Sequence, residues 1–232
     1  MALLVACVDP VPAPSGPADG GSSLDGTVAA SSIAFVQQAT APSAAGTVGT
    51  VKFPSNVKAH DAIIVCVGFA AGTETVSGIT DTLGHTYDPA AGPFDGNGAR
   101  HYIYLASDTS AGADTLTVTL NGSVSNLDIQ AHEYAGLARS TAFDVAASAN
   151  GTSNAPNGMA SGSATTTAGN ELIFGYADAN MVKAGTGFTE RTSISGNVTE
   201  DKVVSVAGAY QATATMTAGN SWTMMMATFR GQ

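Results

Sequence analysis

Alternation of apolar and polar residues is the dominant pattern along this chain, and it predicts β-strands. In Thr115–Leu120 three threonines alternate with Leu, Val and Leu, so one face of the strand points to solvent and the other inward. Gln211–Thr217 repeats this alternation. Ala62–Phe69 and Glu171–Ala177 are apolar at nearly every position, which indicates central strands covered on both faces. Helical periodicity is nearly absent, and Gly, Thr, Ser and Asn recur every few residues, so an all-β fold is expected.

Further short apolar segments complete the predicted strand set. They are separated by Gly, Asn and Asp turns, and about a dozen such strands favour a two-sheet sandwich. The expected strands are Ile33–Gln38, Val48–Phe53, Val76–Thr80, Tyr102–Ala106, Leu127–Tyr134, Phe143–Ala149, Phe188–Ser193, Val203–Ala207 and Trp222–Phe229.

The strand pattern is written twice. Ala59–Val65 returns as Ala168–Phe174, and the copies close on the similar motifs Glu133–Gly136 and Thr228–Gly231. Each copy alone would hold only about five strands, including a run that needs cover on two faces, so the copies must pack on each other. We therefore predict a jelly-roll-like β-sandwich built from two related halves (repeats about 59–136 and 168–231) in a single domain spanning 33–232.

Composition narrows the function classes. The chain is 44% apolar but only 11% charged, so its surface must be mostly Ser, Thr, Asn and Gly, as is typical of secreted β proteins. Eight Lys and Arg against 18 Asp and Glu give a net charge of −10, which disfavours nucleic acid and anionic lipid as partners.

The first 32 residues indicate a location outside the cytoplasm. Leu4–Cys7 resembles a bacterial lipobox, in which Cys7 would be lipidated, and residues 8–32 have the Pro, Gly and Ser content of an extended tether. A basic n-region is missing and the apolar stretch before Cys7 is short, so a trimmed secretion signal is the alternative. Both interpretations place the protein at the extracellular or outer-membrane surface, with a lipid anchor as its membrane contact.

Several motifs together resemble a β-sandwich module of unsettled role from secreted and surface proteins and lipoproteins of environmental bacteria. The resemblance covers roughly Ile33 to the C-terminus and implies the fold and location, but no activity. The motifs are Val76–Asp81 with Gly84–Tyr87, Glu133–Gly136, Gly187–Thr189 and Glu200–Val204.

One strand carries a polar face that is peculiar to the first copy. Alternation places Asp128, Gln130 and His132 on the same face, which indicates either a ligand-binding surface or a solvated outer face. Sandwich-fold glycoside hydrolases need two carboxyl groups flanking the scissile bond, and here Gln and His stand beside the single Asp. The aligned residues of the second copy are Thr223, Met225 and Ala227.

The segment Asp81–Arg100 is expected to be a long loop. It carries four oxygen ligands of the kind calcium takes, separated by Gly and Pro, although their spacing of about seven differs from compact calcium loops. Calcium is therefore one interpretation, and ordinary turns are the other. The candidate ligands are Asp81, Asp88, Asp95 and Asn97.

Aromatic and histidine residues add little. Tyr102 and Tyr104 share one face and form either a sugar-binding platform or part of the core. The four histidines lack zinc-ligand spacing, and no nucleophile-elbow motif is present between a strand and a helix.

These observations favour a non-catalytic surface module that binds glycan, matrix or partner proteins. Alternatives are a self-assembling structural subunit, in which the chain forms homo-oligomers through strand edges, and a polysaccharide-active hydrolase or lyase. No cofactor is assigned, and calcium is the candidate ion.

Overall fold

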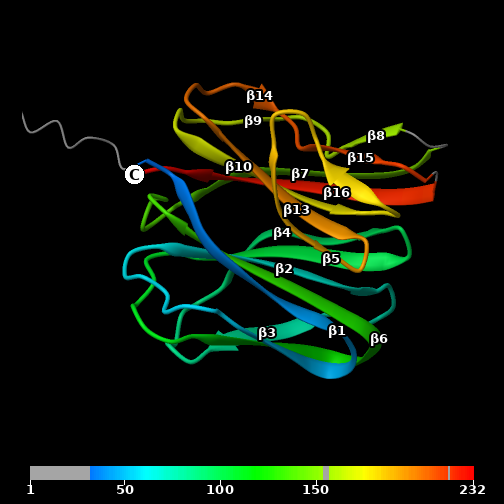
Figure 1. The fold of residues 1–232 in the computed structure, drawn as a ribbon, viewed down its shortest axis with the longest axis horizontal. Coiled ribbons are helices and arrows are strands. Elements are labelled where there is room, and N and C mark those ends of the chain that lie inside the picture. The colour runs from blue at the N-terminus through cyan, green and yellow to red at the C-terminus, as the bar shows by residue number, and fades with distance from the viewer. Residues whose placement is uncertain (1–31, 154–156, 219) are drawn as a thin grey trace, which may run out of the picture.

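The computed structural model describes residues 32–153, 157–218 and 220–232, and this part of the chain is all-β, without helix (Figure 1). The predicted β-sandwich class is therefore confirmed. The first half contains β1 (Ala34–Lys52), β2 (Ala62–Ala70), β3 (Val76–Asp81), β4 (Asp88–Gly96), β5 (Ala99–Ala106) and β6 (Thr115–Ala135). The second half contains β7 (Phe143–Ser153), β8 (Asn157–Ala160), β9 (Ala164–Thr165), β10 (Glu171–Asp178), β11 (Val182–Ala184), β12 (Thr189–Ile194), β13 (Asn197–Val204), β14 (Ala209–Tyr210), β15 (Thr213–Met216) and β16 (Asn220–Arg230).

The main sheets of the two halves have the same strand order. The first runs β1-β6-β2-β5-β4 and the second runs β7-β16-β10-β13-β12, with antiparallel pairing throughout. The central strands β2 and β10 carry the repeated apolar motif. Both are buried along nearly their whole length, because each main sheet is covered on both faces.

Three hydrophobic cores alternate with the layers of the structure (Figure 1). In the first half the long strands β1 and β6 continue past register shifts, and β6 pairs there with β3, so that these segments cover the outer face of the first sheet. The small sheet β11-β15-β8 covers the outer face of the second sheet. The middle core lies between the two main sheets and includes Ile64, Cys66, Phe174 and Tyr176.

The expected long loop at Asp81–Arg100 is wrong, because residues 88–96 form β4. Pro89, Gly92 and Pro93 suggest a loop, but β4 is an edge strand, where a missing N–H is tolerated. Register shifts against β5 accommodate these residues. The strand expected at Val203–Ala207 also differs, since β13 begins at Asn197 and ends at Val204. Its alternate residues Asn197, Thr199 and Asp201 are polar and face the other half.

Candidate functional site

The predicted polar face of β6 lies inside the molecule. Asp128 is 3% exposed, and Gln130 and His132 are fully buried. These three side chains therefore form neither an open ligand-binding surface nor a solvated outer face. Alternation correctly places the three side chains on one face. The second main sheet covers that face, and single-strand periodicity carries no information about such cover.

Polar residues of β12 and β13 meet this face from the second half. His132 Nε2 lies 2.8 Å from Thr199 Oγ1, the Thr192 hydroxyl donates to Gln130, and the hydroxyls of Thr192 and Thr199 are 2.5 Å apart. Asn197 Nδ2 donates to Asp128 Oδ2 at 3.2 Å. We call this set, together with Tyr134, Arg191 and Asp201, the polar interface network.

The far end of the network is ionic. The Tyr134 hydroxyl donates to Asp201 Oδ2 at 2.5 Å, and Arg191 binds both oxygens of Asp201 through Nε at 2.7 Å and Nη2 at 2.9 Å. Burial lowers the pKa of His132 to about 3, so this imidazole is neutral at physiological pH. The network thus joins the halves through hydrogen bonds between neutral side chains and through two carboxyl groups, Asp128 bonded to Asn197 and Asp201 bonded to Tyr134 and Arg191.

At its other end the network opens into a pocket of about 200 Å³, which we call the interface pocket. Its walls come from the ends of β2 and β10, from the middle of β6 and from the β4–β5 and β12–β13 hairpin tips, so both halves contribute. The lining residues are Gly68, Phe69, Ala70, Asn97, Gly98, Ala99, His101, Asn126, Asp128, Asp178, Ser195 and Asn197.

Asp178 is held on one side of the interface pocket by the first half. Its Oδ2 lies 2.9 Å from His101 Nε2, and its Oδ1 accepts a hydrogen bond from Asn97 Nδ2 at 3.1 Å. The His101 side chain is 1% exposed and that of Asp178 14%, so the carboxylate lies near the mouth. His101 Nε2 and Asn97 Nδ2 are thus both engaged with Asp178 within the protein.

Asp128 and Asn197 present acceptors with no partner in the described part of the chain. Asp128 Oδ1 and Asn197 Oδ1 are both buried and accept no hydrogen bond from described residues. Burial raises the pKa of Asp128, and the nearby hydroxyls of Ser195 and Ser43 lower it in part, although neither makes a hydrogen bond of normal geometry with Asp128 Oδ1. The charge of Asp178 raises this pKa further. The pocket therefore offers buried oxygen acceptors to a ligand that donates.

Two hairpin tips shape the mouth. Asn97 and Gly98 have φ of 52° and 73°, and Ser195 and Gly196 have φ of 53° and 87°. Paired positive φ values are those of a two-residue hairpin turn of type I′, which favours Asn and Gly. The turns lie at matching places in the two halves, between β4 and β5 and between β12 and β13.

Tyr102 and Tyr104 do not form an exposed platform. Their rings stack at 5.8 Å, as predicted for a shared face, but Tyr102 is 4% exposed and both rings pack in the core of the first half. The neighbouring residues His101 and Ile103 point to the other face of β5, toward the second half. The two tyrosines and Asp128 are therefore on opposite faces of the first sheet.

The four residues of the predicted calcium set lie in separate environments. Asp88 and Asp95 stand near opposite ends of β4, roughly 20 Å apart at the rise of a strand. Asp95 binds Arg100, and Asn97 binds Asp178 in the interface pocket. No pair of these residues shares an ion-sized space in the described contacts.

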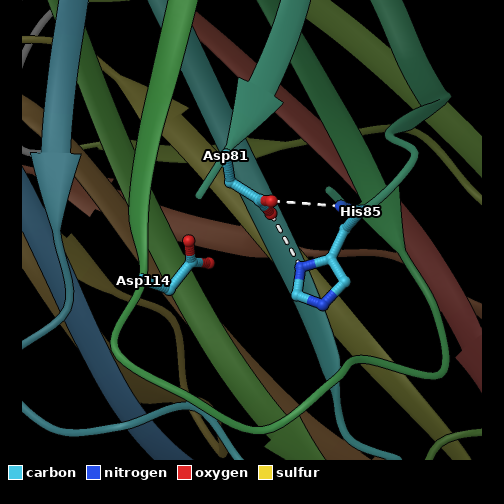
Figure 2. Close-up of side chains that lie close together, drawn as sticks. All are labelled: Asp81, His85 and Asp114. Atoms are coloured by element: carbon cyan, nitrogen blue, oxygen red, sulfur yellow. Dashed lines mark hydrogen bonds and ion pairs between the residues drawn. The ribbon is translucent and has the colours of Figure 1, made fainter. Parts of the chain in front are cut away.

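Asp81 instead closes the turn after β3 (Figure 2). Its Oδ1 accepts the backbone N–H groups of residues 83, 84 and 85 at 3.0, 2.7 and 3.0 Å, and its Oδ2 contacts His85 Nδ1 at 2.7 Å and the Tyr87 hydroxyl at 2.6 Å. Burial alone would raise the pKa of Asp81, but the hydrogen bonds from Tyr87 and His85 outweigh it and lower the pKa. Asp114 lies beside this pair, and ligand atoms of Asp81, His85 and Asp114 fall within 4.8 Å of one another.

The hydrogen bonds of His85 argue against metal binding or base catalysis at this cluster. Its Nε2 accepts the Ser110 backbone N–H at 2.8 Å, so the proton of a neutral ring lies on Nδ1 and is donated to Asp81. No lone pair of that tautomer is free to bind an ion or to activate the Ser110 hydroxyl. The cluster therefore stabilises the turn.

The two cysteines differ in what the structure describes. Cys7 lies outside the described residues, so its lipidation stays a prediction. Cys66 is a fully buried free thiol on β2, as its apolar context predicts, and burial raises its pKa well above the usual value.

Sequence reasoning missed three residues of the pocket: His101, Asp178 and Asn197. His101 stands just before the apolar run of β5, Asp178 ends β10, and Asn197 follows the Ser195–Gly196 turn signal. A search for polar residues at the ends of predicted strands beside turn signals would have found them, although it could not have shown that they meet.

No family model, curated protein or solved structure matches the chain.

Proposed function

We propose that the protein is a non-catalytic surface module that binds a hydroxyl-rich ligand, such as the terminal sugar of a glycan, in the interface pocket. One observation carries the proposal: two buried oxygens, Asp128 Oδ1 and Asn197 Oδ1, line a pocket and lack partners among the described residues. Buried acceptors without a donor are unfavourable, and sugar hydroxyls supply donors.

The dimensions limit what can enter. At about 200 Å³ the interface pocket is smaller than the roughly 300–1,000 Å³ of drug-sized ligand sites. It would therefore take one ring or another small group rather than a chain segment. Recognition would rely on hydrogen bonds, because Tyr102 and Tyr104 are in the core and supply no stacking platform.

A polysaccharide hydrolase is the second candidate, and one observation favours it. Two carboxyl groups line the same pocket, and burial raises the pKa of Asp128, as in a general acid, while Asp178 is held by His101 and Asn97. Against it, Asp128 is 3% exposed, so its carboxyl group is poorly placed to reach a glycosidic oxygen. Binding is therefore the first proposal.

The location outside the cytoplasm remains a proposal from the sequence. It rests on the lipobox-like Leu4–Cys7, the tether composition and the low charge. No helix within the described ranges is long and apolar enough to cross a membrane.

A glycan array probed with the full chain tests the proposal. Asp128→Asn removes the charge and keeps the size, so we expect at least about a tenfold loss of the bound signal from one lost charged contact. Asp108→Asn is the matched control, because Asp108 is about half exposed and lies outside the interface pocket.

Two outcomes would contradict the proposal: an array without any bound glycan, or equal binding by both variants. Release of reducing ends from a bound oligosaccharide, lost in Asp128→Asn, would instead select the hydrolase.

A further inference from the structure

The hydrogen bonds around the interface pocket leave two buried acceptors, Asp128 Oδ1 and Asn197 Oδ1, without a partner in the described chain. Asn197 Nδ2 donates a hydrogen bond to Asp128, and Asn97 Nδ2 donates one to Asp178. His101 Nε2 also faces Asp178. Both oxygens belong to buried residues, since Asp128 is 3% exposed and Asn197 is 4% exposed. A ligand for these positions must donate hydrogen bonds or carry positive charge.

The charge of the pocket favours a positively charged ligand over a neutral hydrogen-bond donor. Two carboxylates line the pocket, and among its described lining residues there is no Lys or Arg to balance them. The chain as a whole carries a net charge of −10. Two carboxylates in a partly buried space repel each other, and a cation between them removes that repulsion.

We propose that the interface pocket binds a divalent cation of the calcium class, held by the carboxylates of Asp128 and Asp178 and the amide oxygen of Asn197. This inference deepens the proposed function, because it concerns the same pocket, and a bound cation would present open coordination positions to ligand hydroxyls. Calcium binds six to eight oxygens, from carboxylates, amides and water, in flexible geometry.

The donor set favours calcium over other divalent ions. Zinc prefers imidazole and thiolate, and the one histidine of the pocket is turned to Asp178. Magnesium requires near-ideal octahedral geometry and keeps most of its water. The cluster of Asp81, His85 and Asp114 is a poorer cation site, because its His lone pair is engaged and Asp81 already accepts five hydrogen bonds, whereas Asp178 accepts only two.

The cation would connect the two halves of the protein. Asp128 belongs to β6 of the first half, whereas Asp178 and Asn197 belong to β10 and β13 of the second. An ion bound by all three exists only in the folded, assembled state, so it must stabilise that state by mass action. Calcium binding is therefore measurable without knowledge of the glycan.

The experiment uses the purified full chain, stripped with EDTA and exchanged into EDTA-free buffer. Calcium chloride is titrated by calorimetry, and the thermal midpoint is measured with and without 10 mM calcium. We expect a Kd on the order of 0.1–1 mM, the range of extracellular calcium modules, and a rise in Tm of about 3–8 °C. Magnesium at the same concentration should give a smaller rise.

Three variants separate the cation site from general effects. Asp128→Asn and Asp178→Asn should each weaken calcium binding at least about tenfold, and Asp108→Asn should bind as the wild type does. Asp178 lies near the mouth, so its variant keeps the test valid if Asp128→Asn fails to fold. The proposal is overturned if 10 mM calcium produces neither heat nor a rise in Tm, or if both pocket variants bind calcium normally.

The outcomes also separate this inference from the proposed function. Glycan binding that persists in EDTA and is lost in Asp128→Asn would overturn the cation and retain the glycan. Calcium binding with a blank glycan array would retain the cation and overturn glycan binding.

Discussion

Tyr134→Phe should measure how strongly the polar interface network joins the two halves. The hydroxyl of Tyr134 on β6 donates to Asp201 Oδ2 on β13 at 2.5 Å, and both residues are buried. The ring packs edge-on against Phe35 at 5.6 Å and Phe174 at 6.3 Å, and phenylalanine keeps these contacts. The substitution therefore removes one hydrogen bond between the halves and little else.

The expected loss of unfolding free energy is about 1.5 kcal/mol. A hydrogen bond to a charged group contributes roughly 1.5–3 kcal/mol. Asp201 keeps the two hydrogen bonds from Arg191, so its carboxylate is not left without a partner, and the lower end of that range applies. For a chain of this length such a loss corresponds to about 3–6 °C in Tm.

Urea unfolding followed by fluorescence of the single Trp222 measures this loss. Trp222 lies in the second half and Tyr134 in the first, so a shifted midpoint also shows that the halves unfold together. Tyr210→Phe is the matched control, because its hydroxyl donates to the Val206 carbonyl at 2.7 Å in an exposed segment, and its loss should stay below about 0.5 kcal/mol. Equal losses in the two variants would refute the assigned role of Tyr134.

Two further predictions test burial at and beyond the pocket. A methyl group on Gly68 would lie 2.5 Å from the buried Tyr176 hydroxyl, so Gly68→Ala should lower the free energy of unfolding in urea by about 1–3 kcal/mol. The control is Gly78→Ala, whose added carbon meets nothing within 4 Å and which should lower it by less than about 1 kcal/mol. A larger loss at Gly78 than at Gly68 would contradict the packing. Burial raises the pKa of Glu200 from 4.5 to about 7, so the unfolded chain releases this proton first and stability falls as pH rises from about 4.5 to 7. Glu200→Gln should flatten that fall by on the order of 2–3 kcal/mol in unfolding measured at pH 5 and 7.5, and an unchanged slope would exclude Glu200 as its source.

The sequence predicts the architecture well because the apolar runs of the two central strands can be recognised without knowledge of their neighbours in the fold. β2 is apolar along its whole length and β10 is apolar between Glu171 and Asp178, and cover on both faces of the sheet explains such runs. The repeat then indicates two sheets that share a core. Strands with mixed signals are harder to predict. β4 contains Pro89 and Pro93, which an edge strand tolerates, and whether a strand lies at the edge depends on how the other strands are arranged.

The candidate site could be predicted only in part, since it depends on what covers each face. Asp128, Gln130 and His132 were grouped correctly by alternation, yet a polar face on a strand usually indicates solvent. Here it faces Thr192, Asn197 and Thr199 of the other half, and each of the three side chains gains one hydrogen-bond partner there. Polar residues at matching places on two sheets resemble two exposed faces until the sheets are brought together.

The interface pocket follows from one small residue in this arrangement. Gly68 on β2 pairs with Asp128 on one side and His101 on the other, so the polar row at this level has a gap at its centre. Tyr176 reaches across from β10 and places its hydroxyl over Gly68, and this hydroxyl lacks a partner within the described chain. Any larger residue at position 68 would displace Tyr176, and the row would close. The gap therefore separates the apolar core from a polar mouth. It explains why the pocket lies at this end of the interface, while the opposite end is occupied by the Arg191–Asp201 pair.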